Sequence, residues 1–217
     1  MEQLRGGVKS HGSAHPDDSA THFRTEIHEF KKGRILEVAL DLFFTKGYER
    51  TTLSAISRQL GATRPFIYAY FQNKSEILSA ICEIGISRPL EALDQARTAG
   101  LPAAEMLRRV VGDVTAITIE NQAYIVVYDR EEMNLEPTAA RHLMQLRREF
   151  DRRLELLLKE GIRSGEFDVE NAKLTAGAIS GMFTWIACWL RPGCDSKAEI
   201  MGHAVRLVDK MVKGGGG

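Results

Sequence analysis

Side chains suited to nucleic-acid contact gather between residues 52 and 74. Arginine and lysine bind phosphate groups, hydroxyl groups donate to phosphate oxygens, and an arginine also matches the two major-groove acceptors of guanine. The candidate contact residues are Thr52, Thr63, Arg64, Pro65, Phe66, Tyr68, Tyr70 and Lys74. We assign Arg64 to a base edge and Phe66 to a thymine methyl group, and we assign the hydroxyl and ammonium groups to phosphates.

Two short helices and a tight turn are predicted to position these side chains. The first helix should end at Gly61, the residue that most readily turns a chain out of a helix. Thr63 is predicted to cap a second helix that starts at Arg64 and has Pro65 in its first turn, where a missing N–H group costs nothing. The residues expected to face a common core are Leu53, Ile56, Leu60, Ile67 and Phe71.

A third helix is expected directly after this pair. Asn73 and Glu76 have the spacing of a capping box. Two helices joined by a short glycine-containing turn form a helix-turn-helix, whose second helix enters the major groove of DNA. The spacing alone also fits a helical hairpin that does not bind DNA, and the retained polar contact residues favour the DNA-binding interpretation.

The same residues resemble the head of the TetR family of bacterial repressors. The matching residues are Thr51-Thr52, Ile56-Ser57, Gly61-Ala62-Thr63, Ile67-Tyr68, Tyr70-Phe71 and Lys74. Ser57, Ala62-Thr63 and Pro65 depart from the Ala, Val-Ser and Gly that are usual in the family. The resemblance is specific over about residues 33–80. It implies an all-α protein with an N-terminal three-helix head and a C-terminal helical-bundle body for ligand binding and dimerisation.

This organisation divides the chain into four parts. We expect a flexible tail over residues 1–30 and the helix-turn-helix domain over residues 31–78. The ligand-binding and dimerisation body should cover residues 79–213, followed by a flexible glycine end over residues 214–217. The histidines of the tail are interpreted as part of a solvated arm and not as a metal site.

Charge, cysteine spacing and the lack of long apolar runs favour a DNA-contacting protein with reduced thiols and no membrane segment. The formal net charge is zero overall, but residues 24–80 carry a net charge of +3 and residues 81–217 a net charge of −2. A mildly basic head agrees with phosphate contact. Cys82, Cys188 and Cys194 form no CxxC pair, so we expect reduced, mostly buried thiols. No apolar run is long enough to span a bilayer, and the protein is expected to be soluble and cytoplasmic, with no membrane partner.

No catalytic constellation is recognisable. The sequence has no HExxH, no GxSxG and no glycine-rich phosphate loop, and the carboxylates Asp129, Glu131 and Glu132 lie in a charge run typical of a surface. We therefore predict no catalytic residues, no cofactor and no metal. A helical enzyme and a protein-binding module remain the alternatives to a DNA-binding regulator.

Helices are expected throughout the body. The first helix of the head is predicted over residues 33–46. A linking helix is predicted over 74–87, up to a kink or interruption at Arg88-Pro89. The body helices are predicted within 101–135, over 137–161 and 169–190, and in a last segment capped by Ser196 and Glu199. β-branched and aromatic runs within residues 101–135 also suit a hairpin, but the spacing of Leu107, Val110 and Val114 favours helices. The charged side of residues 137–161 is interpreted as a solvated face with spaced ion pairs.

The last two helices predict a partner. Both have wide apolar faces that a second copy would bury, so we expect a homodimer with its recognition helices about one DNA turn apart on a palindromic double-stranded operator.

The small-molecule effector is the least determined part of the prediction. Residues 184–193 resemble a Trp-x-x-x-Trp-x-x-Pro-Gly signature of TetR-type regulators of fatty-acid and steroid catabolism, which implies an acyl-CoA thioester. The candidate ligand contacts are Tyr124, Tyr128, Met144, Arg148, Met182, Trp185 and Trp189. Arg147, Arg148 or Arg191 would meet the CoA phosphates. A regulator of drug efflux would hold an aromatic or cationic compound instead, and the two tryptophans alone also fit a dimer interface.

Overall fold

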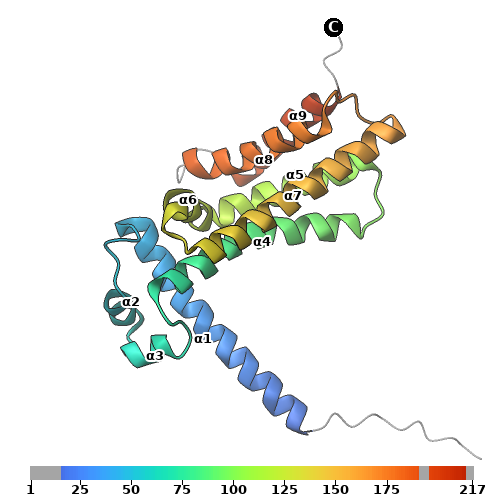
Figure 1. Cartoon of the computed structure of the whole chain (residues 1–217). Coiled ribbons are helices and arrows are strands. Elements are labelled where there is room, and N and C mark those ends of the chain that lie inside the picture. Colours follow the sequence, from blue (N-terminus) through green and yellow to red (C-terminus); the bar gives the residue numbers. More distant parts are fainter. Residues whose placement is uncertain (1–15, 191–195, 214–217) are drawn as a thin grey trace, which may run out of the picture.

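The computed structural model describes residues 16–190 and 196–213, and all regular structure within these ranges is helical (Figure 1). The all-α prediction is confirmed. Residues 1–15 of the predicted tail, Arg191, Cys194 and the glycine end at 214–217 lie outside the described residues. The elements are α1 Pro16–Lys46, α2 Leu53–Leu60, α3 Arg64–Tyr68, α4 Lys74–Arg97, α5 Ala103–Glu120, α6 Gln122–Glu131, the 3-10 turn η1 Glu132–Asn134, α7 Pro137–Ser164, α8 Ala172–Trp189 and α9 Lys197–Val212.

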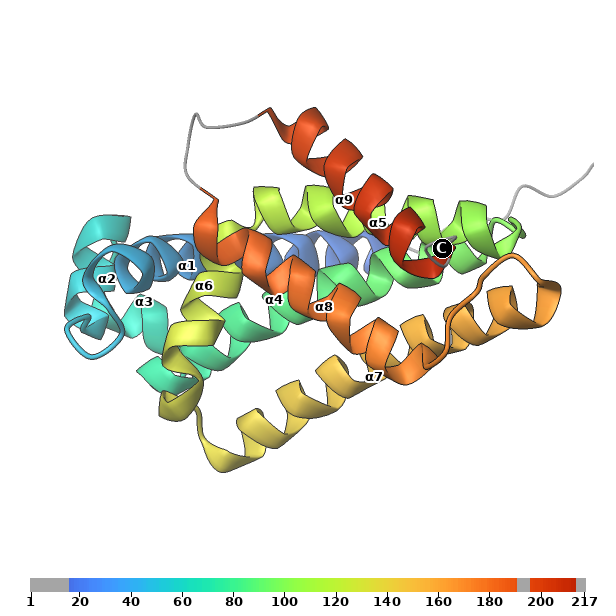
Figure 2. The same ribbon diagram turned by 90° about the horizontal axis from the view of Figure 1, so that it is seen from above.

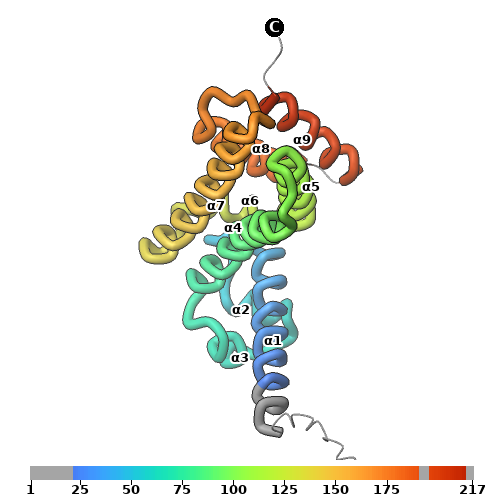
Figure 3. Tube along the Cα trace, turned by 90° about the vertical axis from the view of Figure 1, so that its right-hand side faces the viewer, coloured from blue at the N-terminus to red at the C-terminus, as the bar shows by residue number. Residues whose placement is uncertain are grey.

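The head and the last two helices lie at opposite ends of the molecule. Helices α1, α2 and α3 form the head, and α8 and α9 lie farthest from α3 (Figures 1 and 3). Helix α4 leaves the head and enters the body, where it packs against α5, α6 and α7. Figure 2 shows α8 beside α7 and α9 beside α5.

Buried apolar side chains form two clusters. The first joins α1, α2, α3 and the beginning of α4 to Val127, Leu135 and Leu143 of the body. The second fills the space among the rest of α4, α5, α7, α8 and α9. Because α6 and the start of α7 share a buried core with the head, a movement of either element would shift the side chains on which the head packs.

Helix α1 begins much earlier than predicted. The sequence pattern indicated a helix from residue 33, whereas the structure begins it at Pro16. The side chains of residues 22–30 are exposed, so this segment has no buried apolar stripe from which a helix could be read. This segment continues the buried part of α1. His22 and Glu26 are one turn apart on it, and their Nε2 and Oε1 atoms lie 3.1 Å from each other.

Of the two outcomes predicted at Pro89, an interruption is wrong, because α4 continues through this residue to Arg97. A proline inside a helix lacks an N–H group, and its ring crowds the carbonyl group four residues earlier. That earlier residue is Gly85, which packs on α6 so closely that an added Cβ would lie 3.4 Å from Tyr124 Cβ. Burial of α4 on both sides of the proline therefore holds the helix together.

The other predicted helices are confirmed, with changed ends in α7 and in α8, which covers Ala172–Trp189 instead of residues 169–190. Helices α5 and α6 replace the hairpin alternative, and α9 opens with both bonds of the Ser196–Glu199 capping box. Helix α7 passes through Gly161, its predicted end, and stops at Gly165. The φ of 76° at Gly165 is a left-handed value that glycine adopts at little cost.

The described cysteines have different environments. Cys82 is fully buried in the head cluster, and burial raises the pKa of its thiol to about 12. Cys188 is exposed on α8, so the expectation of mostly buried thiols is wrong for this residue. No helix in the described part of the chain has the length and apolar character needed to cross a membrane.

Candidate nucleic-acid interface and internal cavity

The turn between α2 and α3 is held by its own backbone. Thr52 caps α2, because its hydroxyl oxygen accepts the N–H of Ala55 at 3.1 Å, and its O–H hydrogen remains suited to donating to a phosphate. Gly61 ends α2 with a φ of 67°. The Ala62 N–H then donates to the Ser57 carbonyl at 2.9 Å, which closes the turn.

Thr63 does not cap α3, which corrects the prediction. Its side chain makes no capping hydrogen bond. A cap needs an N–H at the second or third helical position, but the second is Pro65 and the third, Phe66, donates to the Thr63 carbonyl at 3.1 Å. The Thr63 hydroxyl is exposed and is therefore available to an external partner.

Helix α3 separates an inward face from an exposed one. Ile67 and Phe71 are buried at 0% and 2% exposure, as predicted. Arg64 and Pro65 are exposed at the start of the helix, and Tyr68 is 54% exposed. The cationic and phenolic groups thus face outward from a fixed support.

Phe66 and Tyr70 are less available than predicted. Both are half-buried, and their rings lie 5.3 Å apart. The Tyr70 ring also contacts the His28 ring at 4.7 Å, which brings the early part of α1 beside α3. Sequence reasoning missed His28, because the residues around it show no apolar periodicity.

Lys74 has a role inside the head that the phosphate assignment overlooked. Its Nζ donates to the Tyr48 carbonyl oxygen at 2.8 Å and lies 3.9 Å from the centre of the Tyr48 ring. The Tyr48 N–H in turn donates to Glu131 Oε1 at 3.2 Å, at the end of α6. Lys74 and Tyr48 therefore connect the start of α4 and the end of α1 to the body.

The capping box predicted at α4 is shifted by one residue. Asn73 Oδ1 accepts the Glu76 N–H at 2.8 Å, as expected for a cap. The Glu76 carboxylate accepts the N–H of Gln72 at 2.6 Å instead of that of Asn73.

A cavity of about 100 Å³, partly open to solvent, lies among the helices of the body. Its walls come from α4, α5, α6, η1, α7 and α8. The lining residues are Gly85, Ile86, Pro89, Val114, Thr118, Ile125, Tyr128, Asp129, Glu132, Arg147, Phe150, Asp151, Ser180, Phe183 and Thr184. Burial, chiefly, raises the pKa of the Tyr128 phenol above its ordinary value.

The predicted ligand contacts do not converge on this cavity. Tyr128 lines it, together with Arg147, but Tyr124 packs against Gly85 outside the lining. Met144 and Arg148 are exposed on α7 and are absent from the lining, so this cavity does not support their assignment. Arg147 was the alternative that the sequence could not separate from Arg148.

Met182, Trp185 and Trp189 line a second hollow, a groove of about 520 Å³ between α8 and α9. Both tryptophans are exposed, Trp185 at 67%, and neither reaches the internal cavity. Glu199, His203 and Arg206 supply the polar edge of this groove. The remaining lining residues are Ile186, Ile200, Ala204 and Leu207.

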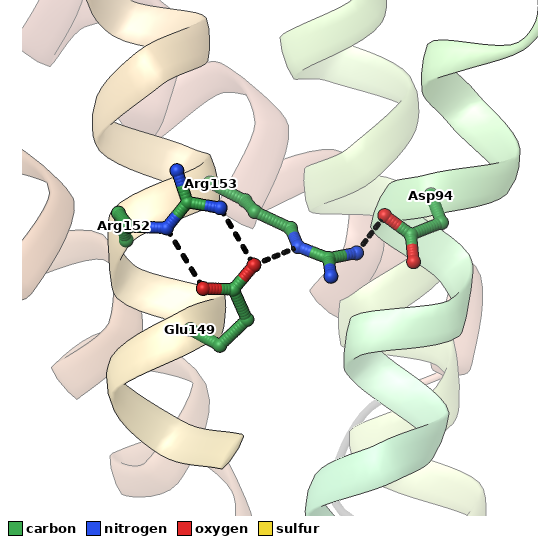
Figure 4. Close-up of polar contacts among 4 residues, drawn as sticks. All are labelled: Asp94, Glu149, Arg152 and Arg153. Carbon is green, nitrogen blue, oxygen red and sulfur yellow. Dashed lines mark hydrogen bonds and ion pairs between the residues drawn. The ribbon is translucent and has the colours of Figure 1, made fainter. Parts of the chain in front are cut away.

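Ion pairs fasten α7 to itself and to α4, as Figure 4 shows. Glu149 Oε1 lies 2.7 Å from Arg152 Nη2 and 2.6 Å from Arg153 Nε. Arg153 also forms an ion pair with Asp94 of α4. Hydrogen bonds from these two guanidinium groups hold the pKa of the Glu149 carboxyl at about 2. The predicted ion-paired face of α7 is confirmed here, and within the described ranges no cluster of His, Cys, Asp and Glu could hold a metal ion.

Comparison with known proteins matches both parts of the chain to one family. Residues 35–81 match the model described as bacterial regulatory proteins, tetR family, and residues 100–212 match the model described as tetracyclin repressor-like, C-terminal domain. YfiR of Bacillus subtilis (strain 168), an uncharacterized HTH-type transcriptional regulator, is 30% identical over 154 residues, which cover 66% of this chain and 71% of YfiR.

Two further relatives are similar over most of their length. The fatty acid metabolism regulator protein of the same Bacillus strain is 25% identical over 189 residues, covering 83% of this chain and 93% of the relative. The crystal structure of PfmR, a TetR family transcriptional regulator from Thermus thermophilus, has a TM-score of 0.75 and 28% identity, and the alignment covers 81% of this chain and 96% of PfmR.

Proposed function

The chain belongs to the TetR family of bacterial transcriptional regulators, and on this premise we propose that it is an operator-binding homodimeric repressor that leaves DNA when a small effector fills the body cavity. The observation that carries the proposal is the two-sided character of α3. One side exposes Arg64 and Tyr68, and the opposite side is buried through Ile67. In this reading α3 enters the major groove with Arg64 at a base edge, and the hydroxyl groups of Thr52, Thr63, Tyr68 and Tyr70 hold phosphates.

The exposed apolar surface of α8 and α9 supports a homodimer. Large apolar side chains on these two helices remain uncovered in the single chain, and contiguous apolar patches on soluble proteins mark interaction sites. These side chains are Leu174, Trp185, Trp189, Leu207 and Met211. Pairing them with a second copy about a two-fold axis would set two α3 helices to read the two halves of a palindrome.

The position of the cavity supports ligand control of DNA binding. Gly85, Ile86 and Pro89 line it from α4, the helix whose first residue, Lys74, is fastened to the head. Tyr128, Asp129 and Glu132 line it from α6 and η1. An occupant that displaced α4 or α6 would therefore change the position of the head relative to a partner head, and with it the fit to the operator.

Two effector classes have support. A thioester is favoured by the Trp-x-x-x-Trp-x-x-Pro-Gly segment and by the similarity to the Bacillus fatty acid metabolism regulator protein. An aromatic or cationic compound is favoured by the lining itself, which holds three carboxylates and one guanidinium. The cavity of about 100 Å³ takes a long acyl chain only if its walls move apart.

Fluorescence anisotropy on the DNA just upstream of the protein's own gene tests the proposal. The dimer should bind this DNA more tightly than scrambled DNA of the same length, and an effector should release it. The titration is repeated with a panel of acyl-CoA esters and with a panel of aromatic and cationic compounds. Equal binding to both DNAs, or none at low salt, would contradict the proposal.

A further inference from the structure

The charged side chains of the cavity are predominantly acidic. Asp129 and Glu132 line it from α6 and η1, Asp151 lines it from α7, and Arg147 is the single basic residue of the lining. Within the described part of the chain, none of the three carboxylates forms an ion pair. With these four groups ionised, the lining carries a net charge of −2.

Neutral hydroxyl groups hold two of these carboxylates in place. Ser180 of α8 donates to Asp151 Oδ1 at 2.6 Å, and the Tyr128 hydroxyl donates to Glu132 Oε1 at 3.4 Å. A hydroxyl donor orients a carboxylate without neutralising its charge. Asp151 is half-buried, whereas Asp129 and Glu132 are exposed, so the charge of Asp151 is the least screened by solvent.

The wall of the cavity also contains a polar group without a partner. Thr118 is 1% exposed, lines the cavity, and has a hydroxyl group that makes no hydrogen bond in the described structure. An unpaired buried hydroxyl is unfavourable, and an occupant with a suitable polar atom would satisfy it. Nearby, Tyr128, Phe150 and Phe183 offer aromatic rings, whose faces attract cations.

We propose that this cavity selects a small organic cation, with its charged group beside Asp151 and its apolar body against Phe150 and Phe183. The inference rests on the proposed role of the cavity as the effector site and names the chemical class of the effector. An anionic thioester would meet three carboxylates and only one guanidinium in the same space, so electrostatics favour the cation.

A pair of isosteric probes isolates the contribution of charge. Phenyltrimethylammonium and tert-butylbenzene have the same shape, and only the first is charged. Ligand-observed NMR titration of the full-length protein should give at least about tenfold tighter binding of the cation. Asp151→Asn keeps the size of the side chain and an acceptor for Ser180, and it should weaken cation binding about tenfold while leaving tert-butylbenzene unchanged.

Controls separate this effect from misfolding and from general surface charge. Asp168→Asn removes an exposed carboxylate between α7 and α8 and should leave both affinities unchanged. The double variant Asp129→Asn, Glu132→Gln gives a second test, with a smaller expected loss, should Asp151→Asn fail to fold.

Equal binding of the two isosteres by the wild-type protein would overturn the inference. So would cation binding that survives both the Asp151 variant and the double variant, or tighter binding of palmitoyl-CoA than of the cation. Operator binding is measured without any ligand, so it is independent of these results. Operator binding without a preference for cations would contradict only this inference. The absence of DNA binding at low salt would contradict the proposed function.

Discussion

Arg64 is the residue on which sequence reading by the head depends most. It is exposed at the start of α3, and a guanidinium group matches the two major-groove acceptors of guanine. Arg64→Ala should cost about 1–3 kcal/mol of binding to the operator and much less on scrambled DNA. Anisotropy titrations on both DNAs measure the difference. Arg141→Ala, at an exposed position in the body, is the control, and an equal loss on both DNAs would reassign Arg64 to a phosphate.

Lys74 provides the contrasting case of a basic residue whose first role is structural. It is half-buried, its ammonium group donates to the Tyr48 carbonyl oxygen and it lies over the Tyr48 ring. Lys74→Met should lower the free energy of unfolding by about 1–2 kcal/mol, since both contacts are lost. Urea denaturation measures this change. Unchanged stability together with weaker binding to every DNA would restore the original phosphate assignment.

The buried Cys82 thiol makes stability fall at alkaline pH. Its pKa is about 12 in the folded protein and near 9.0 in the unfolded chain, so between these values the unfolded chain binds fewer protons. Its contribution is complete below pH 9.0 and is lost as the pH rises, by about 1.4 kcal/mol per pH unit. Urea denaturation should therefore show a steeper loss of stability from about pH 8 to about pH 10 in the wild type than in Cys82→Ala. Parallel losses in the two proteins would show that Cys82 does not cause the effect.

At the scale of elements, the packing of Phe167 on the end of α7 depends on Gly161. A Cβ added at Gly161 would lie 2.1 Å from the buried ring of Phe167, and the Gly161 carbonyl accepts the N–H groups of Glu166 and Phe167. Gly161→Ala should therefore lower the free energy of unfolding by about 1–3 kcal/mol. The matched control is Gly112→Ala in α5, where an added Cβ meets nothing within 4 Å.

The control should behave in the opposite way. Alanine is a better helix former than glycine, so Gly112→Ala should stabilise the protein by about 0.5–1 kcal/mol. Urea denaturation of both variants measures the contrast. Similar effects of the two substitutions would mean that Phe167 moves aside at little cost.

Helix α6 is the element that joins the two candidate sites. Tyr128 and Asp129 line the cavity, whereas Val127 is buried in the head cluster and Glu131 holds the Tyr48 N–H. One short helix thus contacts the effector space and the head with alternating residues. If the proposed function holds, this arrangement would give the signal from effector to DNA a second route beside α4.

For the whole molecule, the apolar surface of α8 and α9 predicts the oligomeric state. Leu207→Glu would place a charge in the proposed interface and should convert the dimer to a monomer in light scattering, with the helical content unchanged by circular dichroism. Met133→Glu, at a 94% exposed position in η1, is the control and should remain dimeric. The monomer should also lose most of its operator affinity, because one head reads only half of a palindrome. A Leu207→Glu protein that remains dimeric would place the interface elsewhere.

Local chemistry was enough to predict the helices of the head, although not the cap at Thr63 or the contacts of Lys74. Gly61, the inward pair Ile67 and Phe71, and the cap at Ser196 depend on neighbours in the sequence, so the spacing of residues determines them. The same holds for the all-α class and for the choice of helices over a hairpin between residues 103 and 131. Where a helix has no buried stripe, as over residues 22–30 of α1, the sequence contains no such signal.

Only the tertiary structure decided which side chains meet across the body. Arg147 and Arg148 are neighbours in the sequence and are both exposed, but the rotation of α7 by one residue places only Arg147 in the lining of the cavity. Packing of buried residues on both sides holds α4 together through Pro89, and this packing cannot be read from the local sequence. The sequence by itself determined the family, the helix-turn-helix of the head, and the exposure of Thr63, Arg64 and Tyr68. The lining and charge of the cavity were decided by helix packing, because they arise from residues more than 90 positions apart that only the folded chain brings together.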